Sequence, residues 1–200
     1  MSNLYIVRHA ESLGNIDKKV YYQMNDCDIP ITDLGKTQAL AAGKTLNDLI
    51  TSDRGDTLFI SSTFKRATDT RDILLEECLK HTPGLKEYFD KKTCPLCVER
   101  SWGGLREIVD GKLLNRDEHF NFYFQPPHGG ESFFQCYQRV VLFFQELRHK
   151  HGKFSNIVVI SHGEWIRLAL MYLDGKSVEE FTTHRKNPKN CEILVRKLLH

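Results

Sequence analysis

Two histidines lie directly after short runs that have the length and apolar composition of buried β-strands. His9 follows residues 4–8, and His162 follows residues 157–161. In an open α/β sheet, ligands bind beyond the carboxyl ends of the strands, so neighbouring strands with these endings would direct both imidazoles into one crevice. Two imidazoles with Arg8 beside one of them suit chemistry on an anion.

A third run of this kind, residues 57–62, leads into a segment that is typical of a helix start. Ser62 or Thr63 is a candidate N-cap, which places Arg66 in the first turn of the helix. The free N–H groups and the dipole of that turn favour a phosphate, and the arginine adds a permanently charged, forked donor. The sequence therefore predicts an anion site shared by three strand ends.

These residues belong to a set of short motifs that stand in a fixed order along the chain. The motifs are Arg8–Ser12 with Asn15, Asp28–Gly35, Ser61–Ala67, Leu105–Glu107, Gly130–Ser132 with Arg139, and Ser161–Gly163. Each is unspecific alone, but all six together resemble the histidine phosphatase superfamily, in particular phosphoglycerate mutase-like proteins. The match runs from about residue 4 to about residue 173, with a plausible last strand at residues 191–195.

The resemblance implies that His9 is the nucleophile and becomes phosphorylated, while Arg8, Arg66 and His162 surround the transferred phosphoryl group. The chemistry of these side chains agrees with the implied roles. Phosphoryl transfer needs a group held in line and charge stabilised on its oxygens, which two guanidiniums and a second imidazole supply without a metal. Their positive charge also disfavours the imidazolium form of His9 and keeps it able to attack.

The resemblance also implies that Asn15 contacts or orients the phosphate and that Glu107 donates and accepts the proton. A carboxyl close to an anionic phosphate has a raised pKa, which suits an acid that protonates a leaving oxygen. Glu11, Asp110 and Glu131 lie near the same motifs and are alternatives for this role, although Glu131 also suits the first turn of a following helix.

The predicted function is a metal-independent phosphatase that hydrolyses phosphomonoesters through a phosphohistidine on His9. One alternative is a phosphoglycerate mutase-type phosphotransferase, which shares every core residue and returns the phosphoryl group to a second hydroxyl. Another is a non-catalytic phosphate-binding module, against which the presence of both a nucleophile and an acid argues. The expected partner is a phosphorylated small molecule; a phosphoprotein stays open as a substrate.

The resemblance has one departure, because Ala10 stands where many members of the family have glycine. An alanine disfavours backbone conformations with positive φ. Arg-His-Ala variants are also found among smaller phosphatases of the family, so we interpret Ala10 as a variant and not as a loss of activity.

The composition is that of an ordinary globular enzyme. The 200 residues are 40% hydrophobic and 27% charged, enough for one good core. A formal net charge of +2 predicts no broad attraction to nucleic acid or to a membrane surface. No run approaches the roughly 20 apolar residues of a membrane span, and the N-terminus leads straight into a strand without a signal peptide, so we expect a cytoplasmic protein.

Strands and helices alternate along the chain, which predicts a three-layer α/β sandwich with a mostly parallel sheet and helices on both faces. Apolar stripes predict helices from about Asp33, after Ser62, after Glu131 and over residues 164–173. We expect a single domain over residues 1–200, with a loop over residues 11–32. An insertion at about residues 82–125 is expected to shape the substrate pocket.

Six cysteines raise a separate question. Cys78, His81, Cys94 and Cys97 have a spacing within reach of a structural Cys3His zinc site, which would stabilise the insertion and take no part in catalysis. Cys78 also falls on the apolar stripe of its helix, where a free cysteine behaves as a small hydrophobe. We favour plain thiols, with zinc and a disulfide as the alternatives.

Overall fold

The arrangement of strands and helices is taken from a computed structural model, which describes residues 1–51, 56–81, 89–103, 108–109, 112–113, 123–124, 129–184 and 186–199. The strands are Ser2–Arg8 (β1), Thr57–Ser61 (β2), Phe89–Thr93 (β3), Ile108–Val109 (β4), Lys112–Leu113 (β5), Asn156–Ser161 (β6) and Ile193–Leu198 (β7). The helices are Leu13–Ile16 (α1), Val20–Gln23 (α2), Asp33–Thr51 (α3), Lys65–His81 (α4), Phe133–His151 (α5), Gly163–Asp174 (α6) and Val178–Thr183 (α7), with short 3-10 helices at Asp26–Asp28 (η1) and Pro95–Cys97 (η3).

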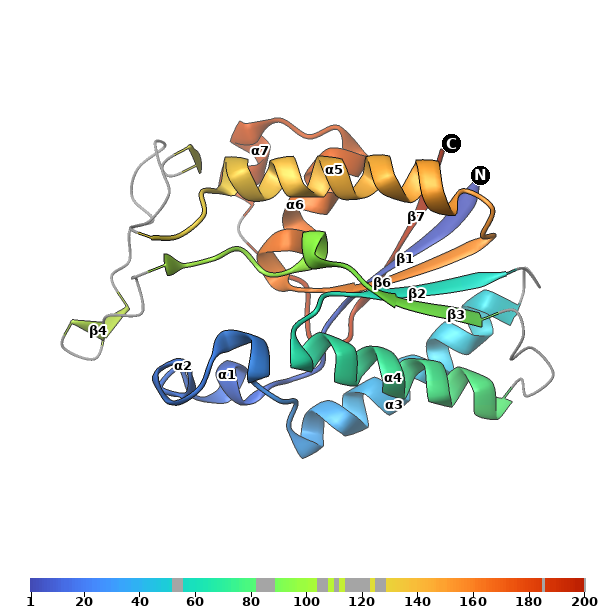
Figure 1. Ribbon diagram of the computed structural model, residues 1–200, viewed down its shortest axis with the longest axis horizontal. Helices are drawn as coiled ribbons and strands as arrows, with labels where there is room; N and C mark the ends of the chain where they lie inside the picture. Colours follow the sequence, from blue (N-terminus) through green and yellow to red (C-terminus); the bar gives the residue numbers. More distant parts are fainter. Residues whose placement is uncertain are drawn as a thin grey trace.

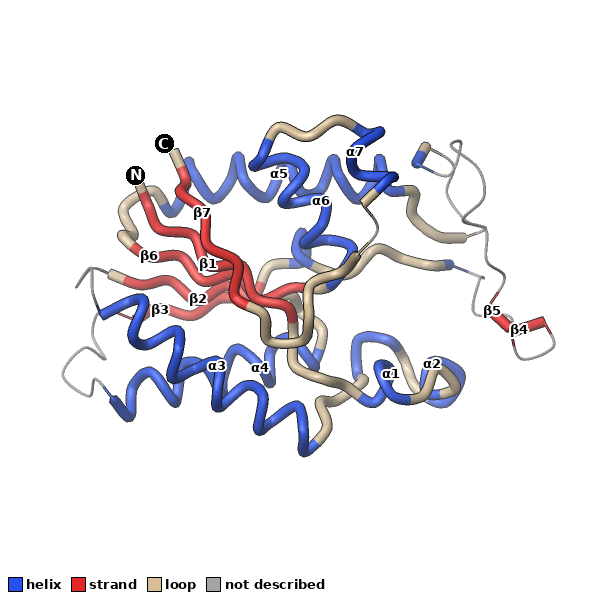
Figure 2. The backbone as a smooth tube through the Cα atoms, turned by 180° about the vertical axis from the view of Figure 1, so that it is seen from behind, coloured by secondary structure: helices blue, strands red, loops and turns tan. Residues whose placement is uncertain are grey.

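Five of these strands form one central sheet in the order β3-β2-β6-β1-β7. The first four are parallel to their neighbours, and β7 runs antiparallel to β1 at one edge. Helices α5 and α6 cover one face of the sheet and helices α3 and α4 cover the other, as Figures 1 and 2 show from opposite sides. The predicted three-layer α/β fold with a mostly parallel sheet is confirmed.

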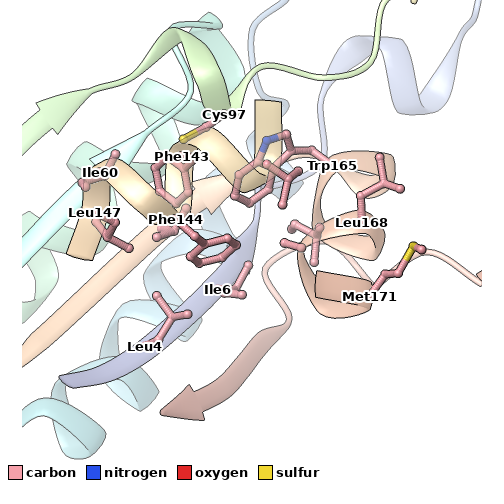
Figure 3. Packing of buried hydrophobic residues seen from close by; sticks show 14 of the residues in the cluster. Leu4, Ile6, Ile60, Cys97, Phe143, Phe144, Leu147, Trp165, Leu168 and Met171 are labelled. Atoms are coloured by element: carbon pink, nitrogen blue, oxygen red, sulfur yellow. The ribbon is translucent and has the colours of Figure 1, made fainter. Parts of the chain in front are cut away.

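The three inner strands, β2, β6 and β1, are buried on both faces because their alternate side chains enter two different hydrophobic clusters. Leu4, Ile6 and Val159 pack with α5 and α6, whereas Tyr5 and Val7 pack with α3 and α4. Figure 3 shows the first cluster, where the side chains of α5 and α6 meet those of the sheet. Burying each large apolar side chain contributes roughly 1.5–3 kcal/mol, which fixes the strand ends that carry the histidines.

The predicted helices are present, with their apolar stripes turned inward. The whole stripe predicted for α5 is buried, and α6 is buried around most of its circumference. The last predicted strand begins two residues later than expected, at Ile193, because Cys191 has a φ of 58° in the turn before it. Residues 11–32 contain α1, α2 and η1, so this segment is more regular than the predicted loop.

Much of the insertion expected at residues 82–125 lies outside the described residues, so its effect on the substrate stays a prediction. Within the described parts of the chain, no helix is both long enough and apolar enough to cross a membrane.

Candidate active site

His9 and His162 lie side by side because the strands that precede them are parallel neighbours. Arg8 at the end of β1 is in register with Ser161 at the end of β6, and the His9 N–H donates to the Ser161 carbonyl at 2.9 Å. The centroids of the two imidazole rings are 5.1 Å apart. The sheet therefore brings together two histidines that are 153 positions apart in the sequence.

The ring of His9 is held as a neutral imidazole of one tautomer. Its Nδ1 lies 2.7 Å from the Ala10 carbonyl oxygen, which can only accept, so Nδ1 carries the proton. Burial and the positive charges of Arg66 and Arg8 hold the pKa of His9 well below its ordinary value. Nε2 is therefore an unprotonated nitrogen with a lone pair, which is the state that a nucleophile requires.

Ser62 is the partner of His162, a role that sequence analysis missed. The Ser62 hydroxyl lies 2.8 Å from Nε2 of His162, and both residues are fully buried. Burial and nearby positive charge, first that of Arg66, hold the pKa of His162 well below its ordinary value. Among the described residues, Nδ1 of His162 has no hydrogen-bond partner.

Arg66 lies in the first turn of α4, as predicted, but the helix begins only at Lys65. The predicted N-cap, Ser62 or Thr63, is wrong, because Phe64 directly precedes the helix. The Ser62 hydroxyl instead contacts His162 and accepts from the Phe64 N–H at 3.2 Å. The Arg66 guanidinium is buried and donates to the carbonyl and the carboxylate of Asp26 at 2.6 and 2.8 Å. Segment η1 thereby fixes the arginine beside His9.

Arg8 and Asn15 complete the group around His9. The Arg8 guanidinium donates to the Pro188 carbonyl at 2.6 Å, and its Nε has no hydrogen-bond partner within the described parts of the chain. Asn190, which sequence analysis missed, donates to the His9 carbonyl at 2.8 Å and to the side-chain oxygen of Asn15 at 3.2 Å. Its position in a turn far along the chain carries no motif, so only the tertiary structure reveals it.

A cavity of about 920 Å³ opens in front of His9. The side chains on its wall that can carry positive charge are Arg8, Lys18, Arg66 and Arg139, and the aromatic ones are Tyr21, Tyr22, Phe64 and Trp102. Burial and the charges of Arg8 and Arg66 lower the pKa of Lys18, so these cations lie close enough to act on each other. His162 is fully buried beside His9 and is not one of the residues that line the cavity. The cations and His9 form a site that suits an anion.

The predicted acid, Glu107, and the alternative Asp110 lie outside the described residues. The other two alternatives have other partners: Glu11 accepts from the Thr32 hydroxyl at 2.8 Å, and Glu131 accepts from Arg139 at 2.6 and 2.7 Å.

One further carboxylate on the cavity wall, Glu99, was missed by sequence analysis. It accepts from the Trp165 N–H at 3.2 Å, at the start of α6, and its charge raises the pKa of Arg8 against the larger effect of burial. Its neighbour in the cavity wall, Glu164, is bound to Arg100 at 2.6 Å, and burial raises its pKa.

Ala10 fits the site as it stands. Among the described residues only Cys191 is a non-glycine with positive φ, so the backbone of Ala10 avoids the conformation that would need glycine. Its side chain is fully buried, and its N–H donates to the Thr70 hydroxyl at 3.0 Å.

The four residues predicted as zinc ligands do not come together. Cys78 packs in the cluster formed with α3 and α4, whereas Cys97 and Cys94 pack in the cluster on the opposite face of the sheet. His81 pairs with Glu77 at 3.1 Å. Within the described parts of the chain, no three His, Cys, Asp or Glu residues are placed to hold a metal ion. The spacing in the sequence suggested one site, but the sheet lies between Cys78 and the other two cysteines.

Comparison with known proteins agrees with this geometry. A family profile for the histidine phosphatase superfamily (branch 1) matches residues 4–198. Phosphoglycerate mutase-like protein AT74 from Arabidopsis thaliana is 31% identical over 98% of this chain and 64% of its own length. Fructose-2,6-bisphosphatase TIGAR B from Danio rerio is 29% identical over 85% of this chain and 74% of its own length.

The solved structure of a mycobacterial glucosyl-3-phosphoglycerate phosphatase has the same fold. It superposes with a TM-score of 0.73 at 20% sequence identity, over 97% of this chain and 89% of that one. Several relatives are longer than this chain, which spans 60% of the length of a 2,3-bisphosphoglycerate-dependent phosphoglycerate mutase from Arabidopsis thaliana. The fold, the paired strand-end histidines and the profile match lead to one conclusion: the chain belongs to the histidine phosphatase superfamily.

Proposed function

We propose that the protein is a metal-independent phosphatase that transfers the phosphoryl group of a phosphomonoester to Nε2 of His9 and then to water. One observation carries the proposal: the Ala10 carbonyl and the surrounding cations hold His9 neutral, with its unprotonated Nε2 beside a cavity that carries positive charge. This combination would not be expected for a histidine with a purely structural role, since positive charge next to a buried imidazole does not stabilise the folded protein.

The groups around His9 are suited to hold a phosphoryl group. Arg8 and Arg66 line the cavity and supply guanidinium donors for the oxygens of a phosphoryl group. Charge that develops on the phosphoryl oxygens is stabilised by donors fixed in advance by Asp26 and Pro188. The arginines thus supply the charge that a metal ion supplies in other phosphatases.

In the first step the leaving oxygen takes a proton from Glu107, and in the second step the same carboxylate activates water. This assignment rests on the family motif Leu105–Glu107. Glu99, another carboxylate on the cavity wall, is the residue with which the acid role of Glu107 is compared. Glu99 already accepts a hydrogen bond from the backbone of α6.

The first experiment measures phosphate release from an aryl phosphate, sugar phosphates, nucleotides and phosphopeptides in excess chelator. We expect wild type to release phosphate and His9→Ala to retain less than about 0.1% of kcat, since catalysis through a covalent intermediate is lost with the nucleophile. The matched control Thr63→Ala alters an exposed residue and keeps full activity. Equal activity of wild type and His9→Ala contradicts the mechanism.

A second experiment assigns the acid. Glu107→Gln should lower kcat far more for an alkyl phosphate than for an aryl phosphate, whose leaving oxygen needs little protonation. Glu99→Gln should lower both by the same factor. The reverse pattern would transfer the acid role to Glu99.

The relatives named as phosphoglycerate mutases make a mutase the alternative function. Both reactions begin with phosphorylation of His9, and they differ in whether water or a second hydroxyl takes the phosphoryl group. Phosphoglycerate isomerisation is therefore assayed alongside phosphate release. Isomerisation without release identifies a mutase, and neither activity with retained binding of inorganic phosphate identifies a binding module.

A further inference from the structure

Cys94 and Cys97 are two sulfur groups that the proposed phosphoryl transfer does not use. They lie at the two ends of the short turn that follows β3, Cys94 half-buried directly before η3 and Cys97 fully buried as its last residue. The sequence between them is Pro-Leu, so the pair has the Cys-x-x-Cys spacing of dithiols that undergo redox chemistry. Neither cysteine forms a disulfide in the structure.

One 3-10 turn holds the two cysteines as neighbours. The Cys97 N–H donates to the Cys94 carbonyl at 3.2 Å, and both side chains pack in the same hydrophobic cluster. The neighbouring Cys97 thiol lowers the pKa of Cys94 to about 7, whereas burial raises the pKa of Cys97 well above its ordinary value. A partly exposed thiolate therefore lies next to a protonated thiol, which is the arrangement in which one sulfur attacks and the other resolves.

The same turn is bonded to the wall of the cavity. The Leu96 carbonyl accepts from Trp165 Nε1 at 2.8 Å and from Arg139 at 2.8 Å, and the next two residues, Val98 and Glu99, line the cavity. A covalent bond between the sulfurs shortens the distance across the turn. The carbonyls of the turn and the segment after it then have to move relative to α6.

We propose that Cys94 and Cys97 form a redox-active dithiol that hydroperoxides oxidise to an intramolecular disulfide, and that the disulfide alters the cavity wall at Val98 and Glu99. The Cys94 thiolate attacks one oxygen of hydrogen peroxide, the O–O bond breaks, and the departing hydroxide takes a proton to become water. The Cys97 sulfur then attacks the Cys94 sulfenic acid, its S–O bond breaks, and the hydroxyl leaves as water with the thiol proton. Two thiols lose two electrons and one peroxide becomes two waters.

Trypsin makes this proposal directly testable, because cleavage after Lys92 and Arg100 releases residues 93–100 as one peptide that contains both cysteines and none of the other four. The intact protein is treated with hydrogen peroxide, its remaining thiols are alkylated under denaturing conditions, and the digest is analysed by mass spectrometry. We expect this peptide to lose two hydrogen atoms and to escape alkylation, and dithiothreitol to restore both thiols. In the same samples, kcat/KM for an aryl phosphate should fall at least threefold on oxidation and recover on reduction.

Variants separate the roles of the two sulfurs. In Cys97→Ser, oxidation by peroxide should stop at a Cys94 sulfenic acid, which dimedone traps. In Cys94→Ser, Cys97 should not be oxidised and should be fully alkylated. The matched control Cys27→Ser removes an exposed cysteine and should still form the disulfide. The wild-type peptide shows whether the disulfide forms even if a variant fails to fold. This readout does not depend on whether the protein is a phosphatase.

Three results would overturn the proposal. The first is full alkylation of both cysteines after peroxide treatment. The second is a peptide that joins Cys97 to Cys136, which would show that Cys97 pairs with a cysteine of α5 and not with Cys94. The third is complete disulfide formation with an unchanged kcat/KM, which would refute the link to the cavity wall.

Discussion

The neutral state of His9 makes a quantitative prediction about how stability depends on pH. In the unfolded chain the imidazole has its ordinary pKa of about 6.5 and binds a proton as the pH falls, whereas folded His9 does not, because burial and Arg66 hold its pKa well below that value. The unfolded state then binds more protons, so acid lowers the free energy of unfolding. The stabilisation is fully present above pH 6.5 and is lost as the pH falls through it.

The size of the effect follows from proton linkage. Between pH 6 and pH 5, an imidazole that titrates only when unfolded lowers the free energy of unfolding by about 1.2 kcal/mol. His9→Gln should therefore lose up to about 1.2 kcal/mol less stability over this interval than wild type does. Glu164 acts in the opposite sense, since its raised pKa gives the folded state the extra proton, but wild type and variant share it and it cancels in the difference.

Urea unfolding at pH 5.0, 5.5, 6.0 and 7.0 measures this difference, with stability taken from linear extrapolation. Ser62→Ala is the matched control, because it perturbs the same site and leaves both imidazoles in place; it should lower stability at every pH with the slope unchanged. If His9→Gln and wild type have the same slope, folded His9 takes up the proton. The ring would then be an imidazolium at pH 5–6, and the neutral nucleophile would be refuted.

The control variant Ser62→Ala and two further variants test individual contacts in and near the site. Ser62→Ala removes the hydroxyl that contacts His162, so the free energy of unfolding at pH 7 should fall by about 1–3 kcal/mol in the same urea assay, and a loss under 0.5 kcal/mol would contradict the contact. Asn190→Ala removes the amide that holds the His9 carbonyl, so kcat for an aryl phosphate should fall about tenfold with KM changed less than twofold; a change in KM alone would count against this role. Gly35→Ala drives a Cβ into the backbone carbonyl oxygen of Glu11, so thermal and urea unfolding should show a loss of about 1–3 kcal/mol, and wild-type stability would refute the close approach.

The central sheet and the first members of the site could be predicted from the sequence, because their signals are local. A run of buried β-branched residues that stops at a polar group predicts a strand end, and three such runs predicted the positions of His9, Arg66 and His162. Apolar stripes predicted α3, α5 and α6 in the same way. Each of these features is encoded within a few consecutive turns or strand residues.

The cysteines show where this local logic fails. The spacing of Cys78, His81, Cys94 and Cys97 suggested one metal site, yet the sheet places Cys78 in one hydrophobic cluster and Cys97 in the other. Sequence spacing measures distance along the chain, whereas a ligand set depends on which face of the sheet each residue meets. Cys94 and Cys97 do lie close together, because two residues three positions apart on one turn cannot be far from each other in space.

By itself, then, the sequence determined the fold class and the strand-end and helix-start positions of the two histidines and two arginines of the candidate site. The tertiary structure alone decided how those residues are held: which nitrogen of His9 carries the proton, that Ser62 contacts His162, and that Asn190 holds the His9 carbonyl. The contacts of Ser62 with His162 and of Asn190 with His9 join residues 100 and 181 positions apart. Their geometry depends on strand order and register, which no local pattern of residues encodes.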